Sequence, residues 1–279
     1  MEQETGALFR ELIAPESSAV DSALYDRKLA DTGLFPEEIL GDSKVDASQY
    51  LTAWIERHDL DHRTSHNTHS AKKTPLDRLL NGTLKIQITC KECKETEEHH
   101  EDFTSPLQLQ VPADAGDINL EGCIDAYFKT RTVQNHECQY CNQLVAATRK
   151  IWFAQLPPNI VFSLNRTHDS GAKISTPVRV NLATIDLQGW CGPHVATKDA
   201  RRYELSSMVM HRGESAQNGT YVAACRVHGS GKEMAQLDGD IHEDKWRIVQ
   251  DETVSKNKAT RMIRNFDGAA QLLFLQKLA

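Results

Sequence analysis

Two Cys-x-x-Cys pairs constrain the fold of this chain more than any other feature. Cys90 and Cys93 flank one tight turn, and Cys138 and Cys141 flank a second. Two such turns brought together present four thiolates in the tetrahedral arrangement of structural zinc, about 2.3 Å from the metal. A redox Cys-x-x-Cys or two local disulfides are the other interpretations, but neither pair precedes the helix of a thioredoxin-like site. We expect one zinc ion per chain, which clamps two hairpins and leaves no open position for catalysis.

The composition limits the class of protein. A chain of 279 residues, 39% apolar and 25% charged, can bury one large core or two small ones. The formal net charge of -7 disfavours nucleic-acid binding, which usually needs a basic surface. No apolar run reaches the roughly 18 to 20 residues of a membrane helix, and the acidic N-terminus does not resemble a signal peptide. We expect an intracellular protein, cytoplasmic or nuclear, with neither nucleic-acid nor membrane partners.

The hydrophobic period changes from helical to strand-like along the chain. The first 58 residues are expected to be mainly helical, most clearly at 46–58 behind an N-cap at Asp46. Residues 59–80 are polar and rich in histidine, so we expect an exposed connection. A period of two at 84–88 and at 107–111 predicts half-buried antiparallel strands.

The second half of the chain is expected to be mostly strands. One short helix is predicted at 119–128, with Cys123 on its buried side. The predicted strands lie at 147–154, 159–164, 178–187, 203–210, 220–227, 245–249 and 271–275. Helices first and strands later favour an α+β architecture with a largely antiparallel sheet.

Several of these segments resemble the ubiquitin-specific proteases, papain-like enzymes that cleave after the C-terminal glycine of ubiquitin. VDASQYL at 45–51 resembles the helix that begins Gln-Asp-Ala-x-Glu-Phe-Leu, and LNGTLKIQITCKEC at 80–93 resembles the strand leading into the zinc-bearing fingers. Segments that resemble the palm strands follow in the family's order, at 155–166, 185–187, 203–213, 246–254 and 272–275.

This resemblance covers about residues 40–279 and implies a papain-like ubiquitin-specific protease fold of the α+β class. A partial helical thumb and linker would occupy residues 1–80, the fingers with the zinc site 81–150, and an antiparallel β palm 151–279.

The catalytic positions depart from the family pattern. The family's general base is the histidine of a Gly-His-Tyr turn, and the matching residue here is Thr220. An aliphatic hydroxyl neither titrates near neutral pH nor stabilises a thiolate. The third triad position, four residues after Trp246, is Gln250, and Asp251 matches the second, structural acid. The family's cysteine box has no match, since no cysteine precedes Cys90.

The resemblance also implies a channel for the ubiquitin tail, an extended Leu-Arg-Gly-Gly strand. The matching residues are Tyr203, His211, Gly213, Gly219, Tyr221 and Trp246. These residues could equally serve folding alone. Of the spare thiols Cys191 and Cys225, the latter lies in an apolar strand and is expected to be buried and neutral.

We therefore expect a catalytically inactive deubiquitinase-like domain that binds ubiquitin weakly or binds a partner protein as a scaffold. The alternative is an active cysteine-type deubiquitinase completed by missing upstream sequence or by a partner chain.

Overall fold

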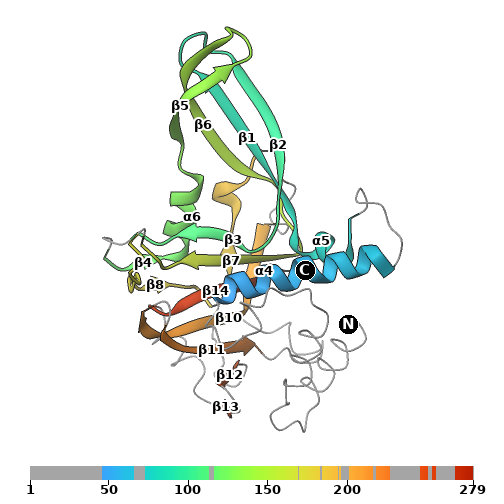
Figure 1. Cartoon of the computed structure of the whole chain (residues 1–279), viewed down its shortest axis with the longest axis vertical. Coiled ribbons are helices and arrows are strands. Elements are labelled where there is room, and N and C mark those ends of the chain that lie inside the picture. Colours follow the sequence, from blue (N-terminus) through green and yellow to red (C-terminus); the bar gives the residue numbers. More distant parts are fainter. Residues whose placement is uncertain are drawn as a thin grey trace.

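The computed structural model describes residues 46–65, 73–112, 116–168, 170–182, 184–193, 195, 201–215, 218–226, 246–250, 253–255 and 268–278. Predictions for residues 1–45 and for Asp251 lie outside these ranges. A four-stranded sheet projects from a body built around an eight-stranded sheet, as Figure 1 shows. The boundaries predicted at residues 80 and 150 remain predictions.

The projecting sheet carries the two cysteine turns. It contains β1 (Gly82–Cys90), β2 (Thr96–Phe103), β5 (Arg131–Cys138) and β6 (Gln143–Gln155) in the order β2-β1-β6-β5, all antiparallel. Leu84 and Ile86 are buried as their alternation predicts, and Leu84 lies opposite the buried Phe153. The edge strands β2 and β5 were not predicted, because their residues are mostly polar on both faces.

The eight-stranded sheet forms the body. Its main path is β13-β12-β11-β10-β14-β7-β3, and β9 pairs with β10. The bounds are β3 Leu107–Gln110, β7 Asn159–Asn165, β9 Ile185–Asp186, β10 Arg202–Ser215, β11 Asn218–Arg226, β12 Trp246–Gln250, β13 Thr253–Ser255 and β14 Ala270–Lys277. β7 is buried along both faces, which explains its apolar run, interrupted only by the buried Ser163.

Two predictions for this region are wrong. The strand at 107–111 runs parallel to β7, with Leu107 opposite Phe162. The chain between β3 and β7 includes two of the four strands of the projecting sheet, β5 and β6, and such a long crossover permits parallel pairing. The strand predicted at 178–187 is two short strands with different partners: β8 (Val178–Arg179) pairs with β4 (Ile118–Asn119), and β9 pairs with β10.

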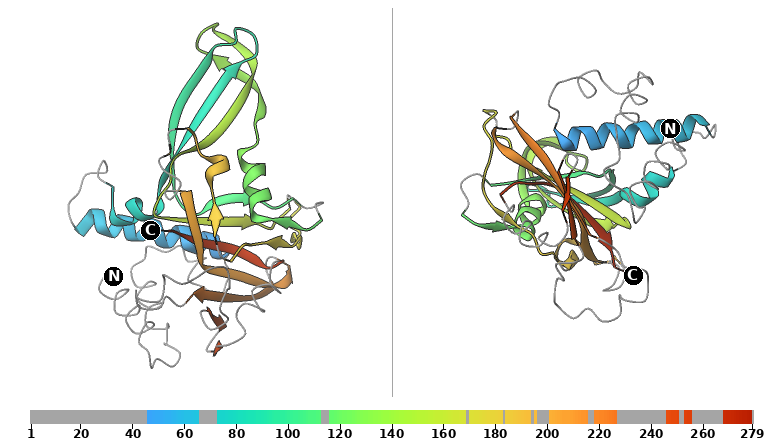
Figure 2. Two further views of the ribbon diagram at one scale, coloured as in Figure 1. Left: turned by 180° about the vertical axis from the view of Figure 1, so that it is seen from behind. Right: turned by 90° about the horizontal axis from the view of Figure 1, so that it is seen from below.

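The helices cover the body and the junction between the sheets. α4 (Ala47–Ser65) packs on β14, and α6 (Leu120–Phe128) packs on β3 and β6. Figure 2 shows α6 where the two sheets meet. Asn119 caps α6, and Cys123 on its inner side is fully buried, as predicted. None of the described helices has the length and apolarity that crossing a membrane requires.

The exposed connection predicted at 59–80 is in large part helical. α4 continues to Ser65, and a further helix, α5 (Pro75–Leu80), packs on β7. Thr74 and Asp77 form a reciprocal capping box, with the Asp77 amide donating to Thr74 Oγ1 at 3.1 Å and the Thr74 amide to Asp77 Oδ2 at 2.8 Å. The capping box and the proline at the first helical position start this short helix.

Candidate functional site

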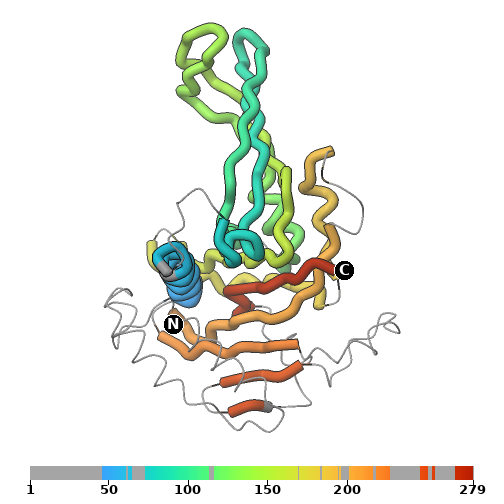
Figure 3. Tube along the Cα trace, turned by 90° about the vertical axis from the view of Figure 1, so that its right-hand side faces the viewer, coloured from blue at the N-terminus to red at the C-terminus, as the bar shows by residue number. Residues whose placement is uncertain are grey.

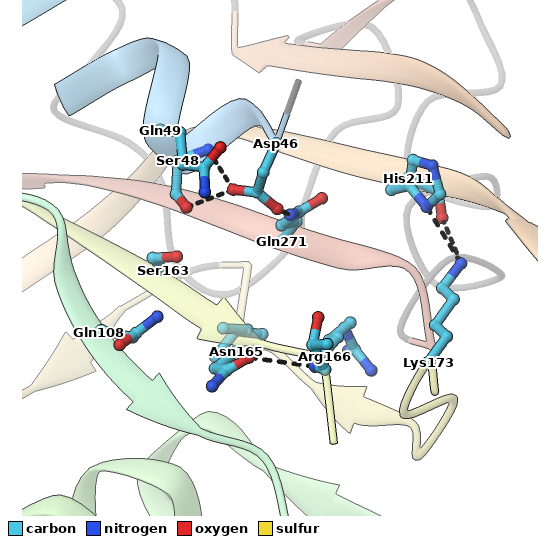
Figure 4. A pocket seen from close by; sticks show the side chains of 12 residues that line it. Asp46, Ser48, Gln49, Gln108, Ser163, Asn165, Arg166, Lys173, His211 and Gln271 are labelled. Atoms are coloured by element: carbon cyan, nitrogen blue, oxygen red, sulfur yellow. Dashed lines mark hydrogen bonds between the residues drawn. The ribbon is translucent and has the colours of Figure 1, made fainter. Parts of the chain in front are cut away.

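A polar pocket lies between the start of α4 and the ends of the body strands. Its volume is about 430 Å³, and Figure 4 shows its side chains. They come from six places in the chain, and the lining residues are Asp46, Ser48, Gln49, Gln108, Ser163, Leu164, Asn165, Arg166, Thr167, Lys173, His211 and Gln271. Such a pocket with few convergent charges can hold a polar ligand in a defined orientation.

Asp46 fixes the α4 side of the pocket. Its Oδ1 accepts the Ser48 amide hydrogen at 2.8 Å, so the predicted N-cap is confirmed. The Ser48 hydroxyl also donates to Oδ1, and the Gln271 amide of β14 donates to Oδ2. The carboxylate is thus positioned by both a helix and a strand.

Lys173 and His211 form the opposite wall. Lys173 Nζ lies 3.2 Å from His211 Nδ1 and donates to the carbonyl oxygens of His211 at 3.2 Å and Gly213 at 2.6 Å. Burial, with a smaller effect of nearby Arg166, lowers the pKa of Lys173. The His211 ring is 5.0 Å from that of Tyr221, whose hydroxyl accepts the Ala47 amide hydrogen at 3.2 Å. His211 and Tyr221 therefore link β10 and β11 to the start of α4.

Arg166 lines the pocket and connects the backbone segments around it. Its guanidinium is buried and donates to the carbonyl oxygens of Ala270 at 2.6 Å, Thr176 at 2.8 Å and Ile174 at 3.3 Å. Desolvation by burial lowers its pKa to about 10, but the group stays charged at neutral pH. It joins the end of β7 to β14 and to the loop that carries Lys173.

Thr220 and Gln250, the residues predicted to match two triad positions, both lie beside Arg212. Thr220 is exposed on β11 and lies opposite Arg212 in the β10–β11 ladder. Arg212 Nη1 donates to the Gln250 side-chain oxygen at 3.4 Å. The groups at both positions are neutral, and a cation lies beside them.

The six residues predicted to line a tail channel have different environments. Tyr203 and Trp246 are 0% and 2% exposed and belong to the hydrophobic core, so their side chains do not line a surface. The side chain of His211 lines the pocket, and the ring of Tyr221 contacts the ring of His211.

The two glycines of this set are required by the β10–β11 ladder itself. A Cβ on Gly213 would lie 1.8 Å from the Asn218 carbonyl oxygen, and one on Gly219 would lie 2.1 Å from that of Arg212. Their lack of a side chain is thus explained by strand packing alone.

His211 is the one lining residue that had been predicted as a site residue; those missed include Gln108, Arg166, Lys173 and Gln271. Arg166 ends a segment that resembles a palm strand, which is a usable signal. The sequence gives no signal for Lys173 or Gln271, because only the fold places them beside His211 and Asp46.

The two spare thiols, Cys191 and Cys225, lie in different environments. Cys225 is exposed, so the prediction that it is buried is wrong: Ala224 and Val222 point inward, and alternation turns Cys225 to the other face. Burial raises the pKa of the Cys191 thiol to about 11, and its Sγ donates to the Leu187 carbonyl oxygen at 3.2 Å.

The four predicted metal ligands come together at the tip of the projecting sheet. Their sulfur atoms all lie within 4.8 Å of one another, with Cys90 and Cys141 Sγ 4.0 Å apart and Cys93 and Cys138 Sγ 3.6 Å apart. Tetrahedral ligands at about 2.3 Å would be about 3.8 Å apart, whereas a disulfide needs about 2.05 Å. The geometry therefore fits a metal ion bound by both turns.

Backbone amides prepare one of the thiols for ionisation. The amides of Glu92 and Cys93 each donate to Cys90 Sγ at 3.4 Å. Burial opposes ionisation, but these donors outweigh it and lower the pKa of Cys90 to about 7. Burial and the neighbouring sulfurs raise the pKa of Cys141 to about 12. A cation among the four sulfurs would favour ionisation of all of them.

A family model matches nearly the whole chain. The family model described as ubiquitin carboxyl-terminal hydrolase matches residues 4–275. The chain belongs to this family. The match begins well before residue 40, where the motifs had placed the start of the resemblance.

Curated family members are similar over most of the chain. Ubiquitin carboxyl-terminal hydrolase 26 of Oryza sativa subsp. japonica is 26% identical over 258 residues, covering 89% of this chain and 21% of that protein. The probable ubiquitin carboxyl-terminal hydrolase 8 of Schizosaccharomyces pombe is 24% identical over 203 residues, covering 72% and 38%. The chain thus spans 21% and 38% of the length of these relatives.

Solved structures share the fold. A SAGA DUB module of Ubp8, Sgf11, Sus1 and Sgf73 bound to monoubiquitin matches with a TM-score of 0.69 and 20% identity, over 87% of this chain and 50% of that chain. The same module bound to ubiquitin aldehyde gives a TM-score of 0.66 at 21% identity, over 88% and 52%. The predicted ubiquitin-specific protease fold is confirmed.

Proposed function

We propose that this chain is a catalytically inactive ubiquitin-specific-protease-like domain that binds ubiquitin or a partner protein. The observation that carries the proposal is the pair of neutral side chains, Thr220 and Gln250, at the general-base and third triad positions. Neither titrates near neutral pH, so neither can take the proton of a thiol. Arg212 engages Gln250, which further separates this arrangement from a triad.

We infer that the pocket beside α4 receives the ubiquitin tail. Two tail glycines have no side chains, which suits a pocket of about 430 Å³. Asp46 supplies an anchored carboxylate at one side and Lys173 an ammonium group at the other. The structural neighbours bound to ubiquitin support this role, and their assembly with Sgf11, Sus1 and Sgf73 supports a partner-binding role.

We also propose that the four-cysteine cluster binds one structural zinc ion. Four sulfur donors with tetrahedral spacing are the set that zinc prefers in closed structural sites. Cys90, Cys93, Cys138 and Cys141 would hold the metal, which neutralises their charge and joins the two turns.

The binding proposal is tested by titrating isotope-labelled ubiquitin with the chain and recording NMR spectra. We expect shifts in the ubiquitin tail and its apolar patch, with a dissociation constant on the order of 10 µM to 1 mM. Gln108→Trp should weaken binding at least about fivefold, because Gln108 is exposed and lines the pocket, so added bulk fills space without removing a core contact.

Gln276→Trp is the control, since Gln276 is an exposed glutamine on the body strand β14 and lies outside the pocket. Substituting Gly219 would be uninformative, because a side chain there collides with β10. An absence of tail shifts at near-millimolar chain would remove ubiquitin as the ligand and leave the partner-protein role.

A further inference from the structure

A second pocket lies at the base of the projecting sheet. Its volume is about 640 Å³, and its walls are β1, β6, the end of α6 and residues 189–193. Residues 189–193 include the end of the 3-10 helix η1 (Gln188–Trp190) and the residues after it, and we call them the η1 segment. Figure 3 shows α4 and the η1 segment on opposite sides of the sheet base. The second pocket is therefore separate from the one proposed for ubiquitin.

Two indole rings form its apolar walls, and both are held in place. A Cβ on Gly192 would lie 2.3 Å from Trp152 Cδ1, so the η1 segment rests directly on this ring. The Gly192 amide also donates to the Phe153 carbonyl oxygen at 2.9 Å. Trp190 Nε1 donates to Asp125 Oδ1 at 2.8 Å. A site whose walls are already fixed loses little entropy on binding.

The ammonium groups determine the charge of a suitable ligand. Lys85 and Lys150 Nζ lie 5.6 and 5.5 Å from the centroid of Trp152. A cationic ligand such as a methylated lysine binds over an aromatic ring, but here the two ammonium groups already lie beside the Trp152 ring and would repel it. Two tryptophans here do not, therefore, make a cage for cations.

Two lysines are available for an anion. Lys85 is paired with Glu98 at 2.8 Å. Lys129, at the C-cap of α6, and Lys150 are exposed, and neither forms an ion pair with another residue in the described part of the chain. Asp125 keeps its negative charge although Trp190 donates to it. The charged side chains that line the pocket are Lys85, Lys129 and Lys150 against Glu98 and Asp125, so their formal charges sum to +1 in a chain whose net charge is -7.

We propose that this pocket binds a short acidic peptide segment of a partner protein, with an apolar or aromatic side chain beside its carboxylates. The apolar side chain would contact Trp152 and Trp190, and the carboxylates would pair with Lys129 and Lys150. A pocket of about 640 Å³ exceeds the needs of a single small anion. The site does not depend on ubiquitin binding, so the two pockets can be filled together.

The probe is a fluorescein-labelled dodecapeptide of Asp and Glu with a central Leu-Phe pair, and the readout is fluorescence anisotropy at low salt. We expect saturable binding that is at least about tenfold weaker in the variant Lys129→Glu/Lys150→Glu, and that falls with added salt because the rim charges are exposed. The control Lys73→Glu/Arg179→Glu makes the same charge change at exposed positions outside this pocket and should bind normally.

A peptide with Lys in place of the acids, and one with Ser-Gly in place of Leu-Phe, should each bind at least about tenfold more weakly. Ubiquitin at saturation should leave peptide affinity unchanged. The proposal is overturned by no saturable binding at millimolar peptide, by equal binding of either altered peptide, by unchanged affinity in Lys129→Glu/Lys150→Glu, or by competition with ubiquitin.

Discussion

Arg212 places a positive charge beside Thr220 and Gln250, the residues that we propose stand at two triad positions. It lies opposite Thr220 and donates to Gln250, so a base restored at 220 would stand beside a cation that disfavours its protonation. We expect Thr220→His alone to leave hydrolysis of ubiquitin-rhodamine at the buffer rate. General-base catalysis contributes about 100- to 10,000-fold in intact sites. A rise of about 100-fold on this single substitution would contradict the interpretation.

Arg166 illustrates a buried charge that serves structure. Arg166→Met would remove three donors and leave the carbonyl oxygens of Ala270, Thr176 and Ile174 without them. We expect a loss of about 2 to 4 kcal/mol in the free energy of unfolding, measured by urea titration. Arg179→Met is the control, because the side chain of Arg179 is 66% exposed and its ion pair with Asp117 should contribute less than about 1 kcal/mol. Equal losses in the free energy of unfolding of the two variants would show that the buried hydrogen bonds of Arg166 stabilise the fold no more than a surface ion pair does.

At the scale of elements, the cysteine cluster joins strands that are far apart in the sequence. Cys93 and Cys138 are 45 positions apart, so a bound metal closes a long loop. Changing Cys138 and Cys141 to Ser should abolish the single zinc found by metal analysis. Hydrogen exchange should accelerate at the tips of β1, β5 and β6, while β7 and β14 stay protected. The control is Cys225→Ser, which removes an exposed thiol outside the cluster and should retain the metal. Loss of zinc from this control, or retention of zinc by the double variant, would refute the ligand set.

Metal retention should also depend on pH. Metal binding requires thiolates, and without metal the pKa of Cys90 is about 7 while that of Cys141 is raised to about 12. Protons therefore compete increasingly as the pH falls, and apparent zinc affinity should decrease steadily from pH 8 to pH 5. A zinc-indicator titration measures this, and affinity that does not change across the range would exclude thiolate ligation.

The sequence predicts an element well where one of its faces is buried. The alternation of β1, the apolar run of β7 and the inner stripe of α6 all reflect packing against the core, and these elements are where they were expected. β2 and β5 are edge strands of a sheet that projects from the body, so their largely polar residues carry no period. α5 depends on a capping box and one proline, which are weaker signals than hydrophobic spacing.

At the scale of the whole molecule, the limits of prediction come from long-range order. The spacing of the cysteines was enough to anticipate their cluster, because each turn already presents two ligands. The pocket beside α4 was not foreseen as a pocket, since Asp46 and Gln271 meet across 225 positions and Lys173 reaches His211 from a loop. The parallel pairing of β3 likewise depends on where the rest of the chain runs.

The most direct test of the central claim is reaction of the purified chain with ubiquitin vinyl sulfone, together with hydrolysis of di-ubiquitin. An activated cysteine is labelled by this reagent, and a chain without a general base beside a thiol is not. We expect no covalent adduct by mass spectrometry and no di-ubiquitin cleavage above the buffer rate, in a preparation that binds ubiquitin by NMR. An adduct on any cysteine, or cleavage that alkylation abolishes, would show that this domain is an active protease.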